Sequence, residues 1–408
     1  MTSRRILRVI TRMNAGGPAR HVAWVSEGLA ARGWETRLLT GDVAAGEDDL
    51  SGVADGRGVD LRRIPGLSRE IDPLRDGAAL AKIVAAIREF DPALVHTHTT
   101  KAGLLGRAAV FLVNATRRRA ARIRAVHTFH GNVLSGHFPP VRERAFRGLE
   151  RLLAHGATDA ILVLSPQQRA EIVERFRISP AEKVSIVPLA LDLGVFATLP
   201  PRGAFRREMG FGDDAFVVGI VGRIAPIKNH EMFLRVAART LLATPHARFV
   251  VVGGGPAAPS LARLARELGI EGAVRFAGLR TDLAQVYSDL DAVALTSRNE
   301  GTPLSLIEAM ASGRAVVATD VGGVRDLLTR EWSGSVEERR FADSGAARGI
   351  LVEPEDVEGF AVALNQLESD ESFRHGLGAA GRLYAHRSHA LSRLLDDLEE
   401  VYARVLVT

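Results

Sequence analysis

The sequence predicts an α/β protein with two doubly wound parallel sheets, each forming its own domain. Its 408 residues are about 2.7 times a typical domain length, and the 46% of them that are apolar suffice for two cores. Short continuous apolar runs alternate with longer helical patterns along the chain. Continuous apolarity is typical of strands buried on both faces, and the intervening helices supply the crossovers between parallel strands.

The predicted strands fall into two groups on either side of a proline-rich segment. Residues 199–204 read Leu-Pro-Pro-Arg-Gly-Ala, and two consecutive prolines continue neither a helix nor a central strand. We therefore expect a Rossmann-like domain over residues 1–198, a second over 205–385, and a cleft between them. A C-terminal helix over residues 386–408 is a candidate to pack back on the first domain. The strands are expected at residues 6–10, 35–39, 94–98, 123–127, 160–164 and 185–187, and at 216–221, 248–253, 274–277, 292–295, 315–319 and 350–352.

Composition excludes several classes of protein. High apolar content and a balance of 53 basic and 48 acidic residues exclude general disorder. The absence of cysteine excludes disulfides, thiolate metal sites and a cysteine nucleophile. No apolar run approaches the ~18 residues of a membrane-spanning helix, and Arg8 interrupts the apolar N-terminus, which therefore lacks the core of a signal peptide. We expect a cytoplasmic protein.

The most informative segment contains two glutamates, Glu300 and Glu308, separated by seven residues. Thr302 as N-cap and Pro303 as first helical residue predict that a helix begins between them. The unpaired amides of its first turn and the positive end of its dipole form an anion site. A nucleotide sugar fits this pattern, because its phosphates accept from amides while its hydroxyls donate to carboxylates. The spacing alone is equally consistent with a turn residue and a helix-surface charge.

A basic loop follows the first strand of the second domain. Gly222 permits close backbone approach, and Arg223 and Lys228 can neutralise a diphosphate. A lone pair of this kind is usually surface charge. The next strand runs into Gly253-Gly-Gly-Pro, which we interpret as a structural turn, because the following strand does not end in the acidic residue that a nicotinamide site needs.

Polar loops also follow the strands of the first domain. Gly16 and Gly17 follow the first strand, and by themselves they are consistent with a simple strand-to-helix turn. His98 ends a strand and, with Lys101, forms either a candidate acceptor loop or a capped helix start, while His130 follows the next strand. We expect no metal site, because no carboxylate or thiolate completes a set at ligand spacing, and two histidines two residues apart on a flat strand, as His96 and His98 are, chelate poorly.

These motifs together resemble the signature of the family 4 retaining glycosyltransferases, which have the two-domain GT-B fold, and the resemblance covers nearly the whole chain. It implies that Glu300 contacts the donor sugar, that Glu308 holds the ribose hydroxyls, and that Arg223 and Lys228 clamp the diphosphate. It also implies that His130 lies under the transferred sugar. We therefore expect catalytic roles for Glu300, His130, Arg223 and Lys228, without a cofactor or a metal.

The resemblance extends to the other site residues. The glycine loop of the first domain is implied to approach the donor phosphate, and the backbone near Arg280 to contact the nucleobase. His98, Lys101 and His130 are the expected acceptor-binding residues. The expected donor-binding residues are Gly16, Gly17, Gly222, Arg223, Lys228, Arg280, Glu300, Gly301, Thr302, Pro303, Leu304 and Glu308.

The net charge of +5 is concentrated in one stretch. Residues 101–151 hold 11 basic and two acidic residues, and within them residues 140–154 place apolar side chains at helical spacing among arginines. A basic amphipathic helix is typical of membrane-surface binding, and a core-facing apolar stripe with a solvated basic face explains the pattern equally well. Nucleic-acid binding is disfavoured, because only 5% of residues are aromatic and no stacking motif accompanies the charge.

We therefore expect a retaining glycosyltransferase that moves a hexosyl unit from a nucleoside-diphosphate sugar, with UDP favoured, to a hydroxyl acceptor. A lipid-linked saccharide of envelope or exopolysaccharide synthesis is the candidate acceptor. The basic helix would then attach the protein peripherally to the inner face of a membrane. Two alternatives stay open: a nucleotide-sugar epimerase of the same fold, and a non-catalytic subunit that binds nucleotide sugars.

Overall fold

The computed structural model describes residues 4–14, 17–43, 49, 51–130, 140–333, 336, 340–343 and 347–407. The chain forms two compact units: Met1–Leu191, Ser333–Arg340 and Leu391–Thr408 in the first, Asp192–Trp332 and Phe341–Ala390 in the second. The chain passes from the first unit to the second after Leu191, which lies before the proline-rich segment of residues 199–204. Helix α7 (Gly194–Ala197) packs with the second unit, where Phe196 meets the ring of Tyr287 edge to face at 5.7 Å between centroids.

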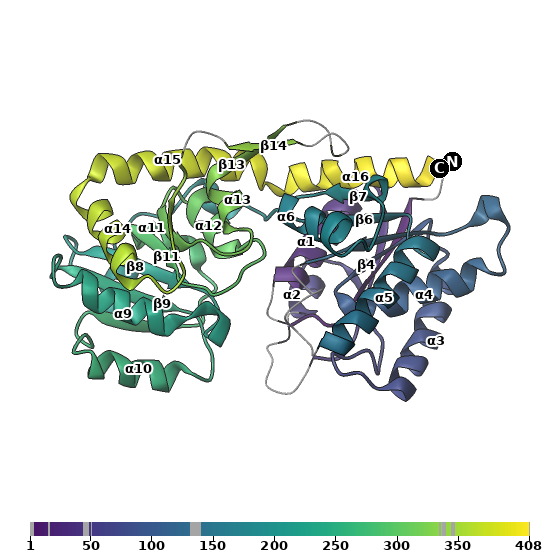
Figure 1. The fold of residues 1–408 in the computed structure, drawn as a ribbon, viewed down its shortest axis with the longest axis horizontal. Helices are drawn as coiled ribbons and strands as arrows, with labels where there is room; N and C mark the ends of the chain where they lie inside the picture. Colours follow the sequence, from purple (N-terminus) through teal and green to yellow (C-terminus); the bar gives the residue numbers. More distant parts are fainter. Residues whose placement is uncertain are drawn as a thin grey trace. The chain divides into compact units, whose positions relative to one another are not determined.

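Seven parallel strands form the sheet of the first unit, in the order β3-β2-β1-β4-β5-β6-β7; β4, β6 and β7 are labelled in Figure 1. The order reverses between β1 and β4, as in a doubly wound sheet that binds ligands beyond the carboxyl ends of its strands. Six strands match the predicted apolar runs. The seventh, β3, was not predicted, because this edge strand reads Asp-Leu-Arg-Arg and is largely exposed. The bounds are β1 (Arg5–Ile10), β2 (Glu35–Thr40), β3 (Asp60–Arg63), β4 (Leu94–His98), β5 (Arg124–Thr128), β6 (Ala160–Val163) and β7 (Val184–Ile186).

Helices cover both faces of this sheet, because its strands are apolar on both sides. On one face Leu7 and Val9 pack with Ile83 and Ile87 of α3. Helix α3 is well delimited: Asp72 caps its first amides, Pro73 follows, and Asp91 ends it in the left-handed conformation. The helices of this unit are α1 (Gly17–Ala31), α2 (Ser51–Asp55), α3 (Pro73–Phe90), α4 (Thr100–Asn114), α5 (Pro140–Gly156), α6 (Pro166–Ala170) and α16 (Leu391–Val407).

The C-terminal helix α16 completes the other face of the first unit's sheet. Its Leu394, Leu398 and Val401 share a core with Ile6 of β1 and with α1. The hydroxyl of Tyr402 lies 2.6 Å from Nδ1 of the buried His96 and accepts a hydrogen bond from Arg8 at 3.3 Å. The last helix of the chain thus reaches the carboxyl half of β4.

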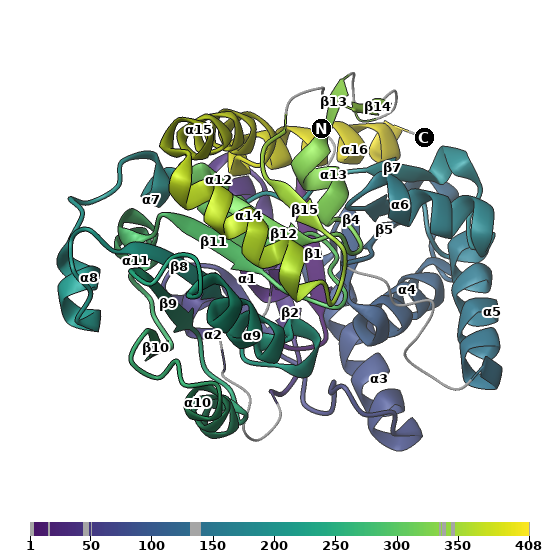
Figure 2. The ribbon, with the colours of Figure 1, turned by 60° about the vertical axis from the view of Figure 1, so that its left-hand side comes forward.

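The second unit is a six-stranded parallel sheet in the order β10-β9-β8-β11-β12-β15 (Figure 2). Its order again reverses beside its first strand, which confirms the predicted pair of doubly wound α/β folds. A separate two-stranded sheet joins β13 (Arg330–Ser333) and β14 (Arg340–Asp343). The main strands are β8 (Phe216–Val221), β9 (Ala247–Val252), β10 (Val274–Gly278), β11 (Ala292–Leu295), β12 (Ala315–Thr319) and β15 (Ile350–Val352), and the remaining helices are α8 (Ala204–Met209), α9 (His230–Thr240), α10 (Ala258–Glu267), α11 (Leu283–Asp289), α12 (Leu304–Ala311), α13 (Val324–Thr329), α14 (Val357–Ser369) and α15 (Glu371–Ser388).

Candidate active site

Helix α12 begins one residue later than the sequence predicted. Pro303, expected as the first helical residue, is the N-cap, because its ψ of 115° is extended, and helical geometry starts at Leu304. The first amide to bond within this turn is that of Leu306, which donates to the carbonyl of Pro303. The amides of Leu304 and Ser305 precede the helical ladder and are donors available at the positive end of the helix dipole.

Glu300 and Lys228 lie in contact at the carboxyl ends of β11 and β8. Lys228 Nζ is 2.6 Å from Glu300 Oε1, and the hydroxyl of Ser297 donates to the same oxygen at 2.5 Å. The Glu300 side chain is 10% exposed and that of Lys228 is 25% exposed. The structure therefore brings together two predicted site residues from different loops and leaves each within reach of solvent.

Arg223 and Gly222 begin the same basic loop. Gly222 has a φ of +150°, and the exposed Arg223 side chain has no hydrogen-bond or ion-pair partner among the described residues. Behind the loop, a Cβ on Gly253 would lie 1.9 Å from the carbonyl oxygen of Gly222. The glycine turn after β9 therefore packs directly against the loop that carries Arg223, as expected of a turn with a structural role.

Glu308 projects from α12 into the second unit and is buried. Its Oε2 accepts a hydrogen bond of 2.9 Å from the hydroxyl of Tyr287 on α11. Tyr287 is itself fully buried and was not predicted as a site residue. Its hydroxyl holds the Glu308 carboxylate in place, and only packing of α11 against α12 reveals this contact.

A third loop, which follows β15, connects the loop that carries Lys228 with the loop that carries Glu300. Glu355 accepts hydrogen bonds from Arg298 at 2.9 Å and from Asn229 at 3.0 Å, and these donors lower the pKa of its carboxyl group. Its φ of +65° is unusual for a residue with a side chain. Strain of this kind concentrates at functional sites. The sequence shows no signal for Glu355, because it lies far along the chain from its partners.

Two further glycines, which the sequence did not predict as site residues, pack closely against the backbone of Glu300 and Gly301. Gly322 has a φ of +52°, and a Cβ there would lie 1.8 Å from the carbonyl oxygen of Glu300. A Cβ on Gly323 would lie 2.2 Å from the carbonyl oxygen of Gly301. The available signal was a pair of consecutive glycines three residues after the predicted strand 315–319.

Arg280 lies after β10, and its side chain is already engaged. It pairs with Glu208 and with Asp282, which raise its pKa further above its ordinary value. The guanidinium also lies over the ring of Phe205 at 5.4 Å. Any nucleobase contact at this position would therefore come from the backbone, which is where the resemblance located it.

The first unit gathers three histidines at the carboxyl ends of its strands. His98 Nδ1 lies 2.9 Å from His130 Nε2, and His21 of α1 joins them. Burial is the main cause that lowers the pKa of all three, to about 4 for His130. They are consequently neutral near pH 7, and the pairing of His98 with His130 brings two predicted site residues together.

The remaining predicted residues of the first unit are placed differently. Lys101 turns toward α3, where its ammonium pairs with Asp76 at 2.5 Å and also donates to the carbonyl of Glu70. Gly17 opens α1, whereas Gly16 lies outside the described residues. Thr99, between His98 and α4, has a φ of +66° and bonds to Thr11 through its hydroxyl at 2.7 Å.

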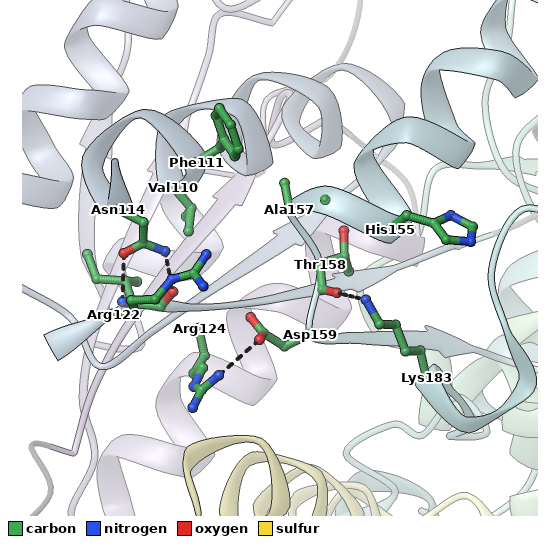
Figure 3. Close-up of a pocket in the computed structure, with 12 residues that line it drawn as sticks. Val110, Phe111, Asn114, Arg122, Arg124, His155, Ala157, Thr158, Asp159 and Lys183 are labelled. Carbon is green, nitrogen blue, oxygen red and sulfur yellow. Dashed lines mark hydrogen bonds and ion pairs between the residues drawn. The ribbon is translucent and has the colours of Figure 1, made fainter. Parts of the chain in front are cut away.

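A cavity of about 160 Å³ opens at the amino ends of β5, β6 and β7, away from the strand ends that carry the predicted residues (Figure 3). Its polar groups are largely paired with one another. Arg124 contacts Asp159 at 3.2 Å, and Lys183 donates to the carbonyl of Thr158 at 2.8 Å. None of the predicted site residues lines it.

Helix α5, the predicted basic amphipathic helix, contacts α4, and one of its charged residues is buried. Glu150 is buried in a bidentate pair with the buried Arg107. Leu153 is also buried, but Leu152 remains 69% exposed and Val141 77% exposed. The apolar stripe is therefore divided between the core and the surface. Within the described residues, no helix is long and apolar enough to cross a membrane.

The chain matches two family models. The model described as "Glycosyl transferase 4-like domain" matches residues 16–190, and "Glycosyl transferases group 1" matches residues 215–370. The matched segments contain the predicted residues of the first and of the second unit, respectively.

Curated relatives and solved structures agree with these matches. The D-inositol 3-phosphate glycosyltransferase of Kineococcus radiotolerans is 32% identical over 90% of this chain and 85% of its own length. The Escherichia coli UDP-Gal:alpha-D-GlcNAc-diphosphoundecaprenol alpha-1,3-galactosyltransferase is 25% identical over 76% of this chain and 74% of its own. Anabaena HepE, crystallised with UDP, shares the fold with a TM-score of 0.78 at 20% identity, covering 98% of this chain and 100% of its own. The chain therefore belongs to the family 4, or group 1, glycosyltransferases and has their GT-B fold.

Proposed function

We propose that this glycosyltransferase moves a hexosyl unit from a UDP-sugar to a hydroxyl acceptor with retention of configuration and without a divalent metal. The observation that carries the proposal is the Lys228–Glu300 contact beside the start of α12. Lys228, Arg223 and the first amides of α12 offer positive charge and donors to a leaving diphosphate, the role that a metal ion has in other transferases. HepE, which shares the fold, has been crystallised with UDP and with UDP-glucose, and this supports the choice of donor.

In the proposed reaction the bond between the sugar C1 and the diphosphate oxygen breaks while the acceptor oxygen bonds to C1 on the same face. The leaving phosphate takes the acceptor proton, so no protein base is required. Lys228 and Arg223 stabilise the charge that grows on the diphosphate, and Glu300 positions the sugar. Glu308, held by Tyr287 at 2.9 Å, accepts hydrogen bonds from the ribose hydroxyls.

For the acceptor we propose a lipid-linked saccharide of envelope or exopolysaccharide synthesis. The acceptor in the name of the E. coli relative is a sugar on diphosphoundecaprenol, which supports this choice. A second candidate is a phosphorylated cyclitol, favoured by the relative that is named for inositol 3-phosphate. Both named acceptors carry phosphate, so a phosphate near the accepting hydroxyl is common to the two candidates.

We propose that the exposed face of α5 contacts anionic lipid. Arg142 and Arg144 are exposed on α5, as are the apolar side chains of Val141 and, further along the helix, Leu152; a membrane-surface helix needs exposed groups of both kinds. Arg151 is instead tied to the carbonyl of Phe176 at 2.8 Å and is a poorer candidate for lipid contact.

The double variant Arg142→Glu, Arg144→Glu is expected to lose binding to vesicles containing phosphatidylglycerol in a flotation assay, and wild-type binding should weaken as salt rises. The matched control, Arg69→Glu with Arg88→Glu, changes the same charge at two exposed positions elsewhere in the first unit and should float like the wild type. Equal flotation of the two double variants would contradict the proposal that α5 contacts anionic lipid.

Calorimetry with UDP-, GDP- and ADP-sugars, followed by product analysis, tests the proposed reaction. We expect binding of a UDP-sugar and formation of an α-linked product in EDTA when a polyprenyl-diphosphate saccharide or inositol 3-phosphate is added. An isomerised sugar from donor alone would instead indicate an epimerase. Tight donor binding with neither transfer nor hydrolysis would indicate a binding subunit, and dependence on added Mg²⁺ would contradict the metal-free mechanism.

A further inference from the structure

Three imidazoles from separate elements converge in the first unit: His21 of α1, His98 at the end of β4, and His130 after β5. One ring nitrogen from each lies within 4.8 Å of the others. The ring centroids are 5.0 Å apart for His21–His130, 5.2 Å for His98–His130 and 5.9 Å for His21–His98. The three rings therefore form a nearly equilateral triangle.

This triangle has the dimensions of a metal site. A tetrahedral Zn²⁺ lies about 2.0–2.1 Å from each imidazole nitrogen, which places the ring centroids of two ligands about 5 Å apart. The Nδ1 atom of His21 is buried without a hydrogen-bond partner in the described part of the chain. Buried polar atoms without partners call for an explanation, and an absent ion is one.

We propose that His21, His98 and His130 form a three-histidine site for a late first-row transition metal, with Zn²⁺ as the representative ion. Neutral imidazoles are ligands that zinc, copper and nickel share, and low pKa values keep these three unprotonated near pH 7. His130 is the least buried of the three, so the fourth coordination position opens on its side. The 2.9 Å contact between His98 and His130 needs only a change of tautomer to free both nitrogens for the ion.

The charges around the three histidines determine how tightly the site binds a cation and which fourth ligand accompanies it. The guanidinium of Arg8 is fully buried and lowers the pKa of His21 and His98, so it also opposes a second cation. No carboxylate takes part in the described histidine cluster. We therefore expect the ion to bind together with an anionic fourth ligand, such as chloride or phosphate, and to bind less tightly than at a structural zinc site.

Titration of the full-length, metal-stripped protein tests the site without reference to transferase activity. Co²⁺ is expected to give the visible absorption bands of a tetrahedral complex, and Zn²⁺ to displace it with a stoichiometry of one. Loss of a hydrogen-bond partner of a metal ligand already weakens binding about 10–100-fold, and we expect His21→Ala to weaken Zn²⁺ binding by at least that much. The control variant His375→Ala removes an exposed histidine beside Glu371 and should bind as the wild type does.

Two results would overturn the proposal: no tetrahedral Co²⁺ spectrum in the wild-type protein, or unchanged Zn²⁺ affinity in a folded His21→Ala. Since His21 is buried, His130→Ala provides a second ligand variant at a more accessible position, and it too should lose the ion. A further readout rests on the proposed function: Zn²⁺ on His130 should inhibit transfer, and EDTA should restore it. Metal binding with no effect on transfer would leave the site intact and would separate it from catalysis.

Discussion

Lys228→Met is expected to lower kcat/KM for sugar transfer by roughly 10²–10³-fold, the range found when one preorganised donor to a developing anion is removed. The ammonium lies 2.6 Å from Glu300 and is 25% exposed, so an incoming diphosphate can compete with the carboxylate for it. The substitution keeps most of the side-chain volume and removes the charge. Transfer should be followed with a UDP-sugar, together with the midpoint of thermal unfolding to establish that the fold persists.

The control for this variant is Lys82→Met, which makes the same chemical change at an exposed lysine of the first unit. It should transfer like the wild type. Glu300→Gln should also lower transfer, because the neutral amide no longer stabilises positive charge on the sugar. Wild-type turnover in Lys228→Met would contradict the assignment of the diphosphate site.

Gly322→Ala is expected to reduce transfer by about 10²-fold, as misplacement of a reacting group by about 1 Å can do. A Cβ at this position would lie 1.8 Å from the carbonyl oxygen of Glu300, so the loop that carries Glu300 must move. The φ of +52° adds strain of its own. Activity and thermal stability should be measured on the same preparation.

Gly269→Ala separates the two effects of that substitution. Gly269 also has a positive φ, +71°, but a Cβ there meets no atom within 4 Å. Both variants should lose stability through backbone strain, whereas only Gly322→Ala should lose activity. If the two variants were equally active, the close approach of Gly322 to Glu300 would have no catalytic importance.

Much of the fold was predictable because a buried parallel strand leaves a strong local signal. Continuous apolar runs located six strands in each sheet, and β3 was missed because an edge strand is exposed and charged. The positions of the loops that we predict to bind the donor were predictable for a related reason: Arg223, Lys228 and Glu300 lie in loops that follow strands, and parallel strands end at one edge of their sheet. The N-cap at Pro303 was misjudged by one residue, as helix ends often are.

The sequence by itself therefore determined the two α/β units and the loops that carry the residues we predict to bind the donor, because both depend on neighbours along the chain. Only the tertiary structure decided which side chains meet. It paired Lys228 with Glu300 and Tyr287 with Glu308, it turned Lys101 toward Asp76, and it brought His21 of the first helix to His98 and His130. Such contacts join residues that are distant in sequence, and their geometry follows from packing between elements, for which no local pattern exists.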